Sequence, residues 1–528
     1  MRYLVHHMLR DSASEHPDRE ALVGGDERLT YAQFAQQTTA LASAFQHRGV
    51  RRGERIAIYL PPGVVLPQVI FACSQAGAVF VPIHHGLFPE QVAHILKDSG
   101  ATTLVTDAQR WTTLQAVIAD TPALQWAIVE GQHEFAAPCA TDDLSQLLRV
   151  AQSNAVEEYG IGKDLAAILY TSGSTGRPKG VMLSHANLLA GAEIVATYLG
   201  ITASDRLLGA LPFSFDAGLN QLTSAVWCGA TTVMVNFRFG RDIVRMLHDE
   251  QITGLAGVPP LWSLLADASS GLARQVPETL RYITNTGGAM PTSLLAKLRA
   301  LLPQTSVFLM YGLTEAFRST YLPPEELDRR PTSMGKAIPN TEILVIDEQG
   351  NACGPGEVGE LVHHGPTVSL GYWGHPELTA RVLRPHPFAG PGVASEERVC
   401  YSGDLVRTDE EGFLYFVGRR DNQIKSSGFR ISPTEVEEVL CQCAGVQHAA
   451  VVGAPDPRLG QHLVAYVVAV EEAVQDAHAI VTHCAGALPR YMVPKRIEFV
   501  SELPLTSSGK VNYSQLRERV EEVDSSRS

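Results

Sequence analysis

The sequence predicts an α/β protein: a large N-terminal domain of layered α/β subdomains plus a small β-rich piece, followed by a small C-terminal α+β domain. Three observations predict it. Short apolar segments alternate with helical patterns over most of the 528 residues. After about residue 335 this alternation gives way to strand–turn–strand units. A final segment of about a hundred residues, enough for a small domain, mixes helices and strands again.

The first part of the chain supplies the strands of a parallel sheet. Each expected strand is short and apolar and is followed by a helical pattern, as in sheets joined by crossover helices. The expected strands lie at 55–60, 78–83, 102–107, 165–171, 231–236, 281–287 and 306–312.

The second part supplies the β-rich piece and the C-terminal domain. A strand, a Gly/Pro turn and a strand are expected over 341–365, and a hairpin over 408–421. Helices are expected at 432–443 and 479–488, and strands at 448–454 and 462–470. A strand ends in a cluster of charges at "GRRDNQ", which predicts domains at 1–420 and 421–528.

Composition and charge exclude several classes of function. The chain is 45% hydrophobic and 19% charged, with a net charge of −14 and no basic stripe, so no nucleic-acid partner is expected. The N-terminus lacks the apolar core of a secretion signal. Eight scattered cysteines are typical of buried thiols in a reducing compartment, which predicts a cytoplasmic protein.

One long stretch, from Ile56 to Pro89, carries no formal charge and is long enough to cross a membrane. Its prolines and glycines instead divide it into a helix over 64–76 and a strand over 78–83. We therefore expect a buried helix–strand unit and no membrane span.

The run "YTSGSTGRPKG" at 170–180 predicts a phosphate-binding loop. Glycines expose backbone N–H groups to an anion, hydroxyls add donors, and Lys179 adds a charge. The pattern matches neither the Walker A nor the Rossmann phosphate loop. A polar surface turn is the alternative, and this density of hydroxyls, glycines and cations disfavours it.

Three further segments follow strands and could complete a nucleotide site. "TGGAM" (286–290) could admit a flat ring against its backbone, and "YGLTEA" (311–316) brings an aromatic face, a hydroxyl and a carboxylate to one strand end. "YSGDL" (401–405) presents Asp404, whose carboxylate could accept both hydroxyls of a ribose. Each segment alone is weak evidence for a nucleotide site, and the evidence lies in their combination.

Together these motifs resemble those of a known family. "YTSGSTGRPKG", "YGLTEA", "YSGDL", "GRRDNQIKSSGFRISPTEVE" and "PLTSSGK" occur in this order over nearly the whole chain. The chain therefore resembles the AMP-forming adenylating superfamily of acyl-CoA synthetases, peptide-synthetase adenylation domains and luciferase. Residues 211–222 and 312–340 are most similar to exosortase A-associated acyl-CoA ligases and to stand-alone amino acid–carrier protein ligases.

The resemblance implies a two-step reaction that uses ATP and Mg²⁺. A carboxylic acid attacks the α-phosphate to give acyl-AMP and pyrophosphate, and a thiol of CoA, or of the phosphopantetheine on an acyl carrier protein, then displaces AMP. It implies a mobile C-terminal domain that carries the catalytic Lys510, a hinge at Asp421, and a segment for the thioester step that includes Lys425, Gly428 and Arg430.

The resemblance also implies which residues bind ATP. Thr171, with Lys510 and Glu315, is expected to act in catalysis, and Glu315 is expected to hold the metal. Tyr311 would stack on the adenine, Thr314 would contact the α-phosphate, and Asp404 and Arg419 would hold the ribose. The other expected ATP and AMP contacts are Ser172, Gly173, Ser174, Thr175, Gly176, Lys179, Gly287, Gly288, Ala289 and Gly312.

The acid pocket is expected in "FSFDAGLN" and the segment after "YGLTEA", with Phe215, Asp216, Ala217, Asn220 and Phe317 along its wall. Amino-acid-activating relatives carry an aspartate at the position of Asp216, where it pairs with the substrate ammonium. A carboxylate in an apolar pocket costs several kcal/mol, as an order of magnitude, without a partner. The sequence therefore predicts a cation or strong donor beside Asp216, either the substrate ammonium or a protein group such as a backbone N–H or Asn220.

The substrate and the thiol remain open at this stage. An acyl-CoA ligase is slightly favoured over an amino acid–carrier protein ligase by the match at "LTEAFRSTYLPPEE". A kinase or GTPase is disfavoured because neither Walker A nor the "HRD" and "DFG" motifs occur. A catalytically dead scaffold would be expected to have lost Lys510, Glu315 or Asp404, and all three are present.

Overall fold

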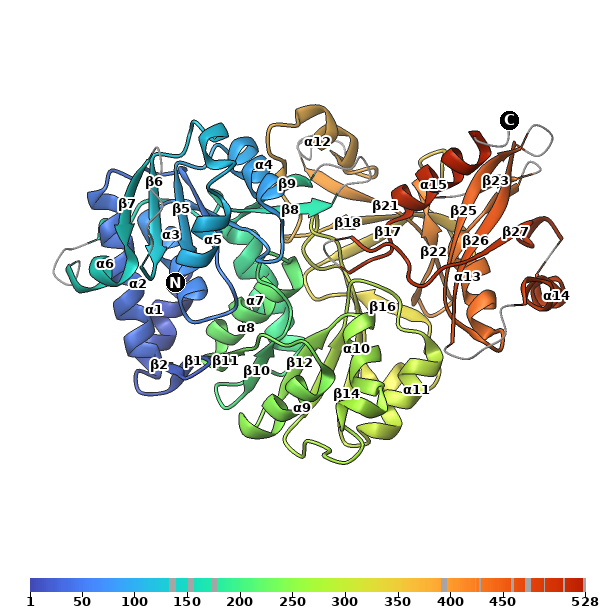
Figure 1. Ribbon diagram of the computed structural model, residues 1–528, viewed down its shortest axis with the longest axis horizontal. Helices are drawn as coiled ribbons and strands as arrows, with labels where there is room; N and C mark the ends of the chain where they lie inside the picture. Colours follow the sequence, from blue (N-terminus) through green and yellow to red (C-terminus); the bar gives the residue numbers. More distant parts are fainter. Residues whose placement is uncertain are drawn as a thin grey trace. The chain divides into compact units, whose positions relative to one another are not determined.

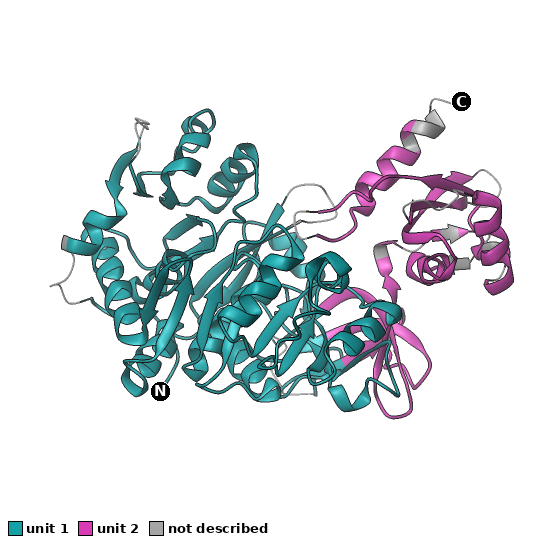
Figure 2. Ribbon diagram, turned by 60° about the horizontal axis from the view of Figure 1, so that its bottom comes forward, with its two compact units in different colours: residues 1–171, 178–343, 363–400 teal, residues 172–177, 344–362, 401–528 magenta. Residues whose placement is uncertain are grey.

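The computed structural model describes residues 1–132, 139–150, 156–172, 178–390, 397–422, 424–426, 429–456, 460–470, 476–488, 490–506 and 509–525 (Figure 1). The chain divides into two compact units (Figure 2). Unit 1 comprises residues 1–171, 178–343 and 363–400, and unit 2 comprises residues 172–177, 344–362 and 401–528.

The first sheet of unit 1 is parallel through most of its width, because helices cross between successive strands. Its β19 edge is antiparallel to β9. The strand order is β19 (Gly371–Tyr372), β9 (Pro178–Ser184), β8 (Leu165–Ser172), β4 (Val79–Pro82), β3 (Arg55–Tyr59), β5 (Thr103–Asp107), β6 (Trp126–Glu130) and β7 (Ala140–Asp143).

The second sheet of unit 1 is parallel from β1 to β14 and antiparallel at both edges. The carboxyl ends of β13 and β14 therefore meet at one edge of the sheet. The strand order is β16 (Ser333–Ala337), β15 (Thr320–Leu322), β14 (Ser306–Tyr311), β13 (Tyr282–Asn285), β12 (Gly254–Gly257), β10 (Arg206–Gly209), β11 (Thr231–Met234), β1 (Glu20–Gly24) and β2 (Glu27–Thr30).

Helices of unit 1 share one large apolar core with strands of both sheets. Within it, α7 packs against α8, and the Phe317 ring is fully buried. The helices are α1 (His6–Glu15), α2 (Tyr31–His47), α3 (Val65–Ala76), α4 (Pro89–Ser99), α5 (Ala108–Thr113), α6 (Leu144–Val150), α7 (His185–Leu199), α8 (Asp216–Cys228), α9 (Gly240–Asp249), α10 (Pro259–Ala266), α11 (Thr292–Leu301) and α12 (Pro376–Val382).

Unit 2 holds most of a small β-rich piece. The strands follow the order β17 (Glu342–Ile346), β18 (Val358–His364), β21 (Arg398–Thr408) and β22 (Leu414–Arg419). The hairpin β21–β22 places Asp404 directly opposite Arg419. This pairing brings together two residues that lie in separate motifs of the sequence.

The C-terminal part of unit 2 packs helices on both faces of one sheet. Val451 and Ala465 face the core with α13 (Pro433–Gln442) and α14 (Ala477–Ala487). Their neighbours Val452 and Val464 face the core with α15 (Tyr513–Ser525), as the alternation of strand side chains requires. The strands are β24 (Phe429–Ile431), β23 (Ile424–Ser426), β26 (Gly460–Ala469), β25 (Val446–Asp456) and β27 (Arg496–Phe499).

The predicted fold class is confirmed, and its elements lie where the sequence placed them. Ser184 caps α7 through a hydrogen bond from the Asn187 N–H, and Gly200 ends the helix in the left-handed region.

The charge-free stretch forms the buried helix α3 and the strand β4. In the part of the chain that the structure describes, no helix has both the length and the apolar character needed to cross a bilayer. The eight cysteines are free thiols, and the cytoplasmic location stays a prediction.

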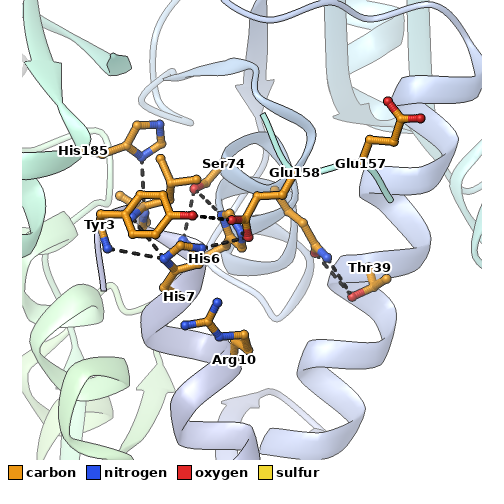
Figure 3. Close-up of polar contacts among 12 residues, drawn as sticks. Tyr3, His6, His7, Arg10, Thr39, Ser74, Glu157, Glu158 and His185 are labelled. Atoms are coloured by element: carbon orange, nitrogen blue, oxygen red, sulfur yellow. Dashed lines mark hydrogen bonds and ion pairs between the residues drawn. The ribbon is translucent and has the colours of Figure 1, made fainter. Parts of the chain in front are cut away.

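The N-terminal helix is tied to the rest of unit 1 by the Glu158 cluster, which we define as Tyr3, His6, His7, Ser74 and Glu158 (Figure 3). One carboxylate oxygen of Glu158 accepts from the Nε2 atoms of His6, at 3.0 Å, and His7, at 2.8 Å. The other accepts from the Tyr3 hydroxyl at 2.8 Å. His6 Nδ1 meets the Ser74 hydroxyl at 3.0 Å, and His7 Nδ1 accepts from the Tyr3 backbone N–H at 3.3 Å.

Candidate functional site

The phosphate loop joins β8 to β9, as its position after an apolar strand predicted. Thr171 lies at the end of β8 and Lys179 at the start of β9, and both are half-buried. Ser172 is the last residue of β8. Gly173, Ser174, Thr175 and Gly176 lie outside the described residues, so their predicted phosphate contacts stay predictions.

The "TGGAM" turn follows β13 and is held by a residue that sequence reasoning missed. The Asn285 side-chain amide donates to the Gly288 carbonyl at 2.9 Å and is buried. Gly287 has a φ of 76°, which a glycine adopts without strain. Gly288 and Ala289 are exposed, so this turn presents backbone at the strand end.

The "YGLTEA" segment begins at the neighbouring strand end. Tyr311 is the last residue of β14, and Gly312, Thr314 and Glu315 follow it in the loop that leads to β15; all four are half-buried. The Tyr372 hydroxyl donates to Glu315 Oε1, and the Ser369 N–H donates to the Glu315 carbonyl. These two contacts hold the glutamate in place without using its second carboxylate oxygen.

Unit 2 brings its predicted ribose residues together. Asp404 is 4% exposed, and its Oδ1 lies 2.8 Å from Arg419 Nη1. Gly403, with a φ of 72°, donates its N–H to the buried Glu360, which also pairs with Arg420 at 2.6 Å. The Asp404 carboxylate and the Arg419 guanidinium are therefore held by the hydrogen-bonded strands β21 and β22.

The remaining predicted residues of unit 2 lie on turns and hairpins. Lys510 is exposed and ends a tight turn in which its N–H donates to the Thr506 hydroxyl at 3.2 Å. Lys425 and Arg430 lie opposite each other across the β23–β24 hairpin. Gly428 lies outside the described residues, and Asp421 is in the short helix η4 (Arg420–Asn422).

Asp216, the first residue of α8, has a protein cation beside it. The Arg318 Nη1 atom lies 3.5 Å from Asp216 Oδ2, and the two side chains are 4% and 12% exposed. The sequence predicted a cation or strong donor here, and the structure supplies Arg318, a protein group that the sequence analysis did not name. The sequence analysis did not identify Arg318. The one signal for it was its position directly after Phe317, an expected pocket residue, because a buried carboxylate needs a compensating cation.

Phe317 and Arg318 reach this position through an uncommon backbone conformation. Phe317 has a φ of 57°, a left-handed geometry that costs a bulky residue about 1–3 kcal/mol. Its buried ring contacts α7 so closely that a Cβ on Gly191 would lie 2.5 Å from two ring carbons. The same point lies 3.4 Å from Asn220 Nδ2.

Of the acid-pocket residues predicted from the sequence, Asn220 lies beside Phe317, and Asp216 is linked to it through Arg318. We define the Arg318 cluster as Asp216, Asn220, Phe317 and Arg318. Ala217 is buried beside Asp216 on α8, and Phe215 is the residue that precedes the helix. Gly312 adjoins the cluster, because a Cβ there would lie 3.6 Å from Arg318 Nη1.

Comparison with known protein families decides the assignment. The family model of the AMP-binding enzyme matches residues 9–373, and that of the AMP-binding enzyme C-terminal domain matches residues 435–510. The chain belongs to the AMP-binding enzyme family.

Members of this family with curated names or solved structures cover almost all of the chain. The feruloyl-CoA synthase of Amycolatopsis sp is 32% identical over 510 residues, which cover 95% of this chain and 96% of the relative. The delta-poly-L-ornithine synthetase of Acinetobacter baumannii is 32% identical over 511 residues, but the chain spans only 36% of that protein's length. ATP-bound MatB from Rhodopseudomonas palustris superposes with a TM-score of 0.88 at 26% identity, covering 99% of this chain and 100% of MatB.

These matches confirm the predicted family and enzyme class, an AMP-forming acid–thiol ligase. They also agree with the two-part organisation, since separate models match the N-terminal and C-terminal parts of the chain. The roles of individual residues and the domain boundary at 420 stay predictions.

Proposed function

We propose that this AMP-binding enzyme joins a carboxylic acid to CoA, and that it is not an amino acid–carrier protein ligase. The observation that carries the proposal is the pairing of Asp216 with Arg318. A buried carboxylate needs one compensating cation, and here the protein supplies it. A substrate ammonium placed beside Asp216 would also stand close to the Arg318 guanidinium and be repelled by it.

The phosphate loop is proposed to hold the β- and γ-phosphates and to release them as pyrophosphate. Its hydroxyls and backbone N–H groups would donate to phosphate oxygens, and Lys179 would add a charge-assisted hydrogen bond. Thr171 lies near the end of β8, before the loop, and Lys179 lies near the start of β9, after it. The proposed contacts are Thr171, Ser172, Gly173, Ser174, Thr175, Gly176 and Lys179.

The adenosine part of ATP is proposed to contact three of the motifs found in the sequence. Tyr311 would stack on the adenine, with Gly287, Gly288, Ala289 and Gly312 along its edge. The Asp404 carboxylate would accept hydrogen bonds from the ribose hydroxyls, and the Arg419 guanidinium would donate to them. The 2.8 Å pairing of these two side chains supports the proposal, because it orients the carboxylate in advance.

Thr314 is proposed to donate to the α-phosphate, and Glu315 to hold Mg²⁺. The fit of Glu315 is good: its carboxylate is half-buried, and the Tyr372 hydroxyl uses only Oε1. One carboxylate together with phosphate oxygens is a common ligand set for this cation. Mg²⁺, when bound, would neutralise part of the phosphate charge.

The C-terminal domain, proposed as residues 421–528, would serve both half-reactions. Lys510 would bridge the acid carboxylate and the α-phosphate while acyl-AMP forms, stabilising the negative charge that develops. Rotation about Asp421 would then remove Lys510 and bring Lys425, Gly428 and Arg430 to the thiol. Lys510 is exposed, which suits a residue that enters and leaves a site.

The proposal is tested in two stages. Exchange of labelled pyrophosphate into ATP is measured with a panel of aliphatic, aromatic and amino acids, and thioester formation is then compared between CoA and a phosphopantetheinylated carrier protein. We expect exchange with a carboxylic acid that lacks an ammonium, and transfer to CoA. If no acid supports exchange, the adenylation function is wrong; if an amino acid is preferred and Asp216→Ala raises its KM, the choice of substrate is wrong.

A further inference from the structure

The Arg318 cluster contains two buried hydrogen-bond donors without partners. Asn220 is 2% exposed and Arg318 is 3% exposed. Among the described residues, neither Asn220 Nδ2 nor Arg318 Nε has a hydrogen-bond partner. A buried donor without a partner is costly, and most buried polar groups in native proteins are satisfied. Two such donors in one cluster therefore indicate a missing acceptor.

The two donors lie around one aromatic ring. Asp216 and Asn220 are four residues apart on α8 and share one face of the helix. Asn220 lies beside the point where the Phe317 ring meets Gly191. The Arg318 guanidinium carbon lies 5.9 Å from the centroid of the same ring, and Arg318 pairs with Asp216. The cluster is thus compact, and its polar groups come from α8 and the segment after β14.

The chemistry of these groups selects the missing partner. An arginine side chain can only donate, and Asn220 Nδ2 also donates, so both need an acceptor. Asp216 already balances the charge of Arg318. A neutral oxygen therefore fits better than a second carboxylate, which Asp216 would repel, and better than an ammonium, which cannot accept.

We propose that the acid activated by this enzyme carries a neutral acceptor oxygen, a keto or hydroxyl group, on its acyl part, and that Asn220 and Arg318 bind it. This inference rests on the proposed function of a CoA ligase. It makes Asn220 and Arg318 specificity-determining residues. Plain alkyl acids would leave both donors unpaired and would be rejected for that reason.

The first test uses the unaltered full-length enzyme. Pyrophosphate exchange is measured with short-chain, medium-chain and aromatic acids. Each type is tested in three forms: the unsubstituted acid, the acid with a keto or hydroxyl group, and the acid with an amino group. We expect the oxygen-bearing acid of the best-accepted type to have a kcat/KM about 10- to 100-fold above its unsubstituted match. Equal values, or a preference for the amino acid, would overturn the inference.

The second test removes one donor. Asn220→Leu keeps the volume and deletes the amide, so we expect the preference for the oxygen-bearing acid to fall about tenfold. The same change should raise Tm, because an unpaired buried amide is removed. A residue that only supports the fold would lower Tm instead and leave the preference unchanged. Thr223→Val is the matched control, since Thr223 is buried on the same helix and its hydroxyl donates to the Asn220 backbone carbonyl, not to a side chain of the cluster.

The outcomes separate this inference from the function on which it rests. If no acid of any type supports exchange, the proposed function fails and the inference fails with it. If exchange is strong but the plain and oxygen-bearing acids are equal, and Asn220→Leu changes nothing, the ligase function stands and the inference is wrong.

Discussion

Two polar clusters of unit 1, the Glu158 cluster and the Arg318 cluster, differ in how completely their hydrogen bonds are satisfied. In the Glu158 cluster each carboxylate oxygen and each ring nitrogen of His6 and His7 has a hydrogen-bond partner (Figure 3). In the Arg318 cluster one ion pair spans 3.5 Å and two donors have no partner among the described residues. The first cluster is complete within the protein, and the second is complete only with a ligand.

The difference shows how the two kinds of cluster are recognised. A satisfied cluster rigidifies the fold. Burial would raise the pKa of the Glu158 carboxyl, but the hydrogen bonds from its neighbours, His7 first, outweigh burial and lower the pKa to about 2. An unsatisfied cluster, held beside a residue at positive φ, has the features of a binding site.

The largest expected effect comes from breaking the ion pair of the Arg318 cluster. Arg318→Met leaves the Asp216 carboxylate buried without a cation, which costs about 3–5 kcal/mol of unfolding free energy. Urea unfolding followed by tryptophan fluorescence measures it. The double variant Asp216→Asn/Arg318→Met should recover most of the loss. A single variant as stable as the wild type would show that the pair contributes little.

The matching change in the Glu158 cluster should affect stability alone. In Glu158→Gln an NH₂ group replaces one acceptor oxygen and faces donors, so we expect a loss of about 2–3 kcal/mol. The preference among acids should stay as in the wild type. Glu157→Gln is the control, because Glu157 lies beside it in the chain and its carboxylate accepts from Tyr159 instead of from the histidines. A changed acid preference in Glu158→Gln would break the contrast between the two clusters.

A smaller effect is expected where α7 meets the Arg318 cluster. Gly191→Ala places a methyl group 2.5 Å from the Phe317 ring, and the overpacking should cost about 1–3 kcal/mol and lower kcat/KM. Gly486→Ala is the control, because it is also in a helix but has no atom within 4 Å of the new Cβ. That variant should be as stable as the wild type or slightly more stable. Equal behaviour of the two variants would refute the close packing at Gly191.

The smallest effect is the pH dependence of the Glu158 cluster. Burial lowers the pKa of His6 to about 4, below the ordinary 6.5. As the pH falls below 6.5 the unfolded chain takes up this proton first, so the stability that is present above pH 6.5 is lost progressively toward pH 4. Between pH 7 and pH 6 the loss should be roughly 0.5–1 kcal/mol.

This pH effect is measured as the difference between the wild type and His6→Asn, which lacks the titrating ring. The wild type should lose more unfolding free energy than the variant over this interval. Parallel pH profiles would show that His6 does not titrate differently in the folded protein. His185, whose pKa burial lowers to about 3, adds to the loss in both proteins.

Much of the fold was predictable because it is decided locally. The strands β3, β4, β8, β13 and β14 are short apolar runs, and α7 carries its own cap and stop signals. The charge-free stretch was assigned correctly because prolines and glycines divide it. Asp404 and Arg419 were expected from two motifs to share the ribose, and the hairpin β21–β22 places them opposite each other.

The partner of Asp216 could not be predicted with the same reasoning. Its identity depends on the left-handed Phe317, which turns the chain after β14 so that Arg318 meets α8. A positive φ at an aromatic residue has no local sequence signal, since glycine and asparagine are the residues that favour it. The roles of Asn285 and Tyr372 were missed for a related reason, because each contacts a motif from outside it.

The sequence by itself determined the family and the order of the elements, because short motifs and hydrophobic periodicity are written along the chain. It also predicts the residues that meet ATP, and it predicted a cation or strong donor beside the carboxylate at position 216. Only the tertiary structure decided which cation it has and which donors beside it lack partners. Hydrogen-bond satisfaction depends on residues brought together from separate helices and loops, and packing alone settles which of them meet.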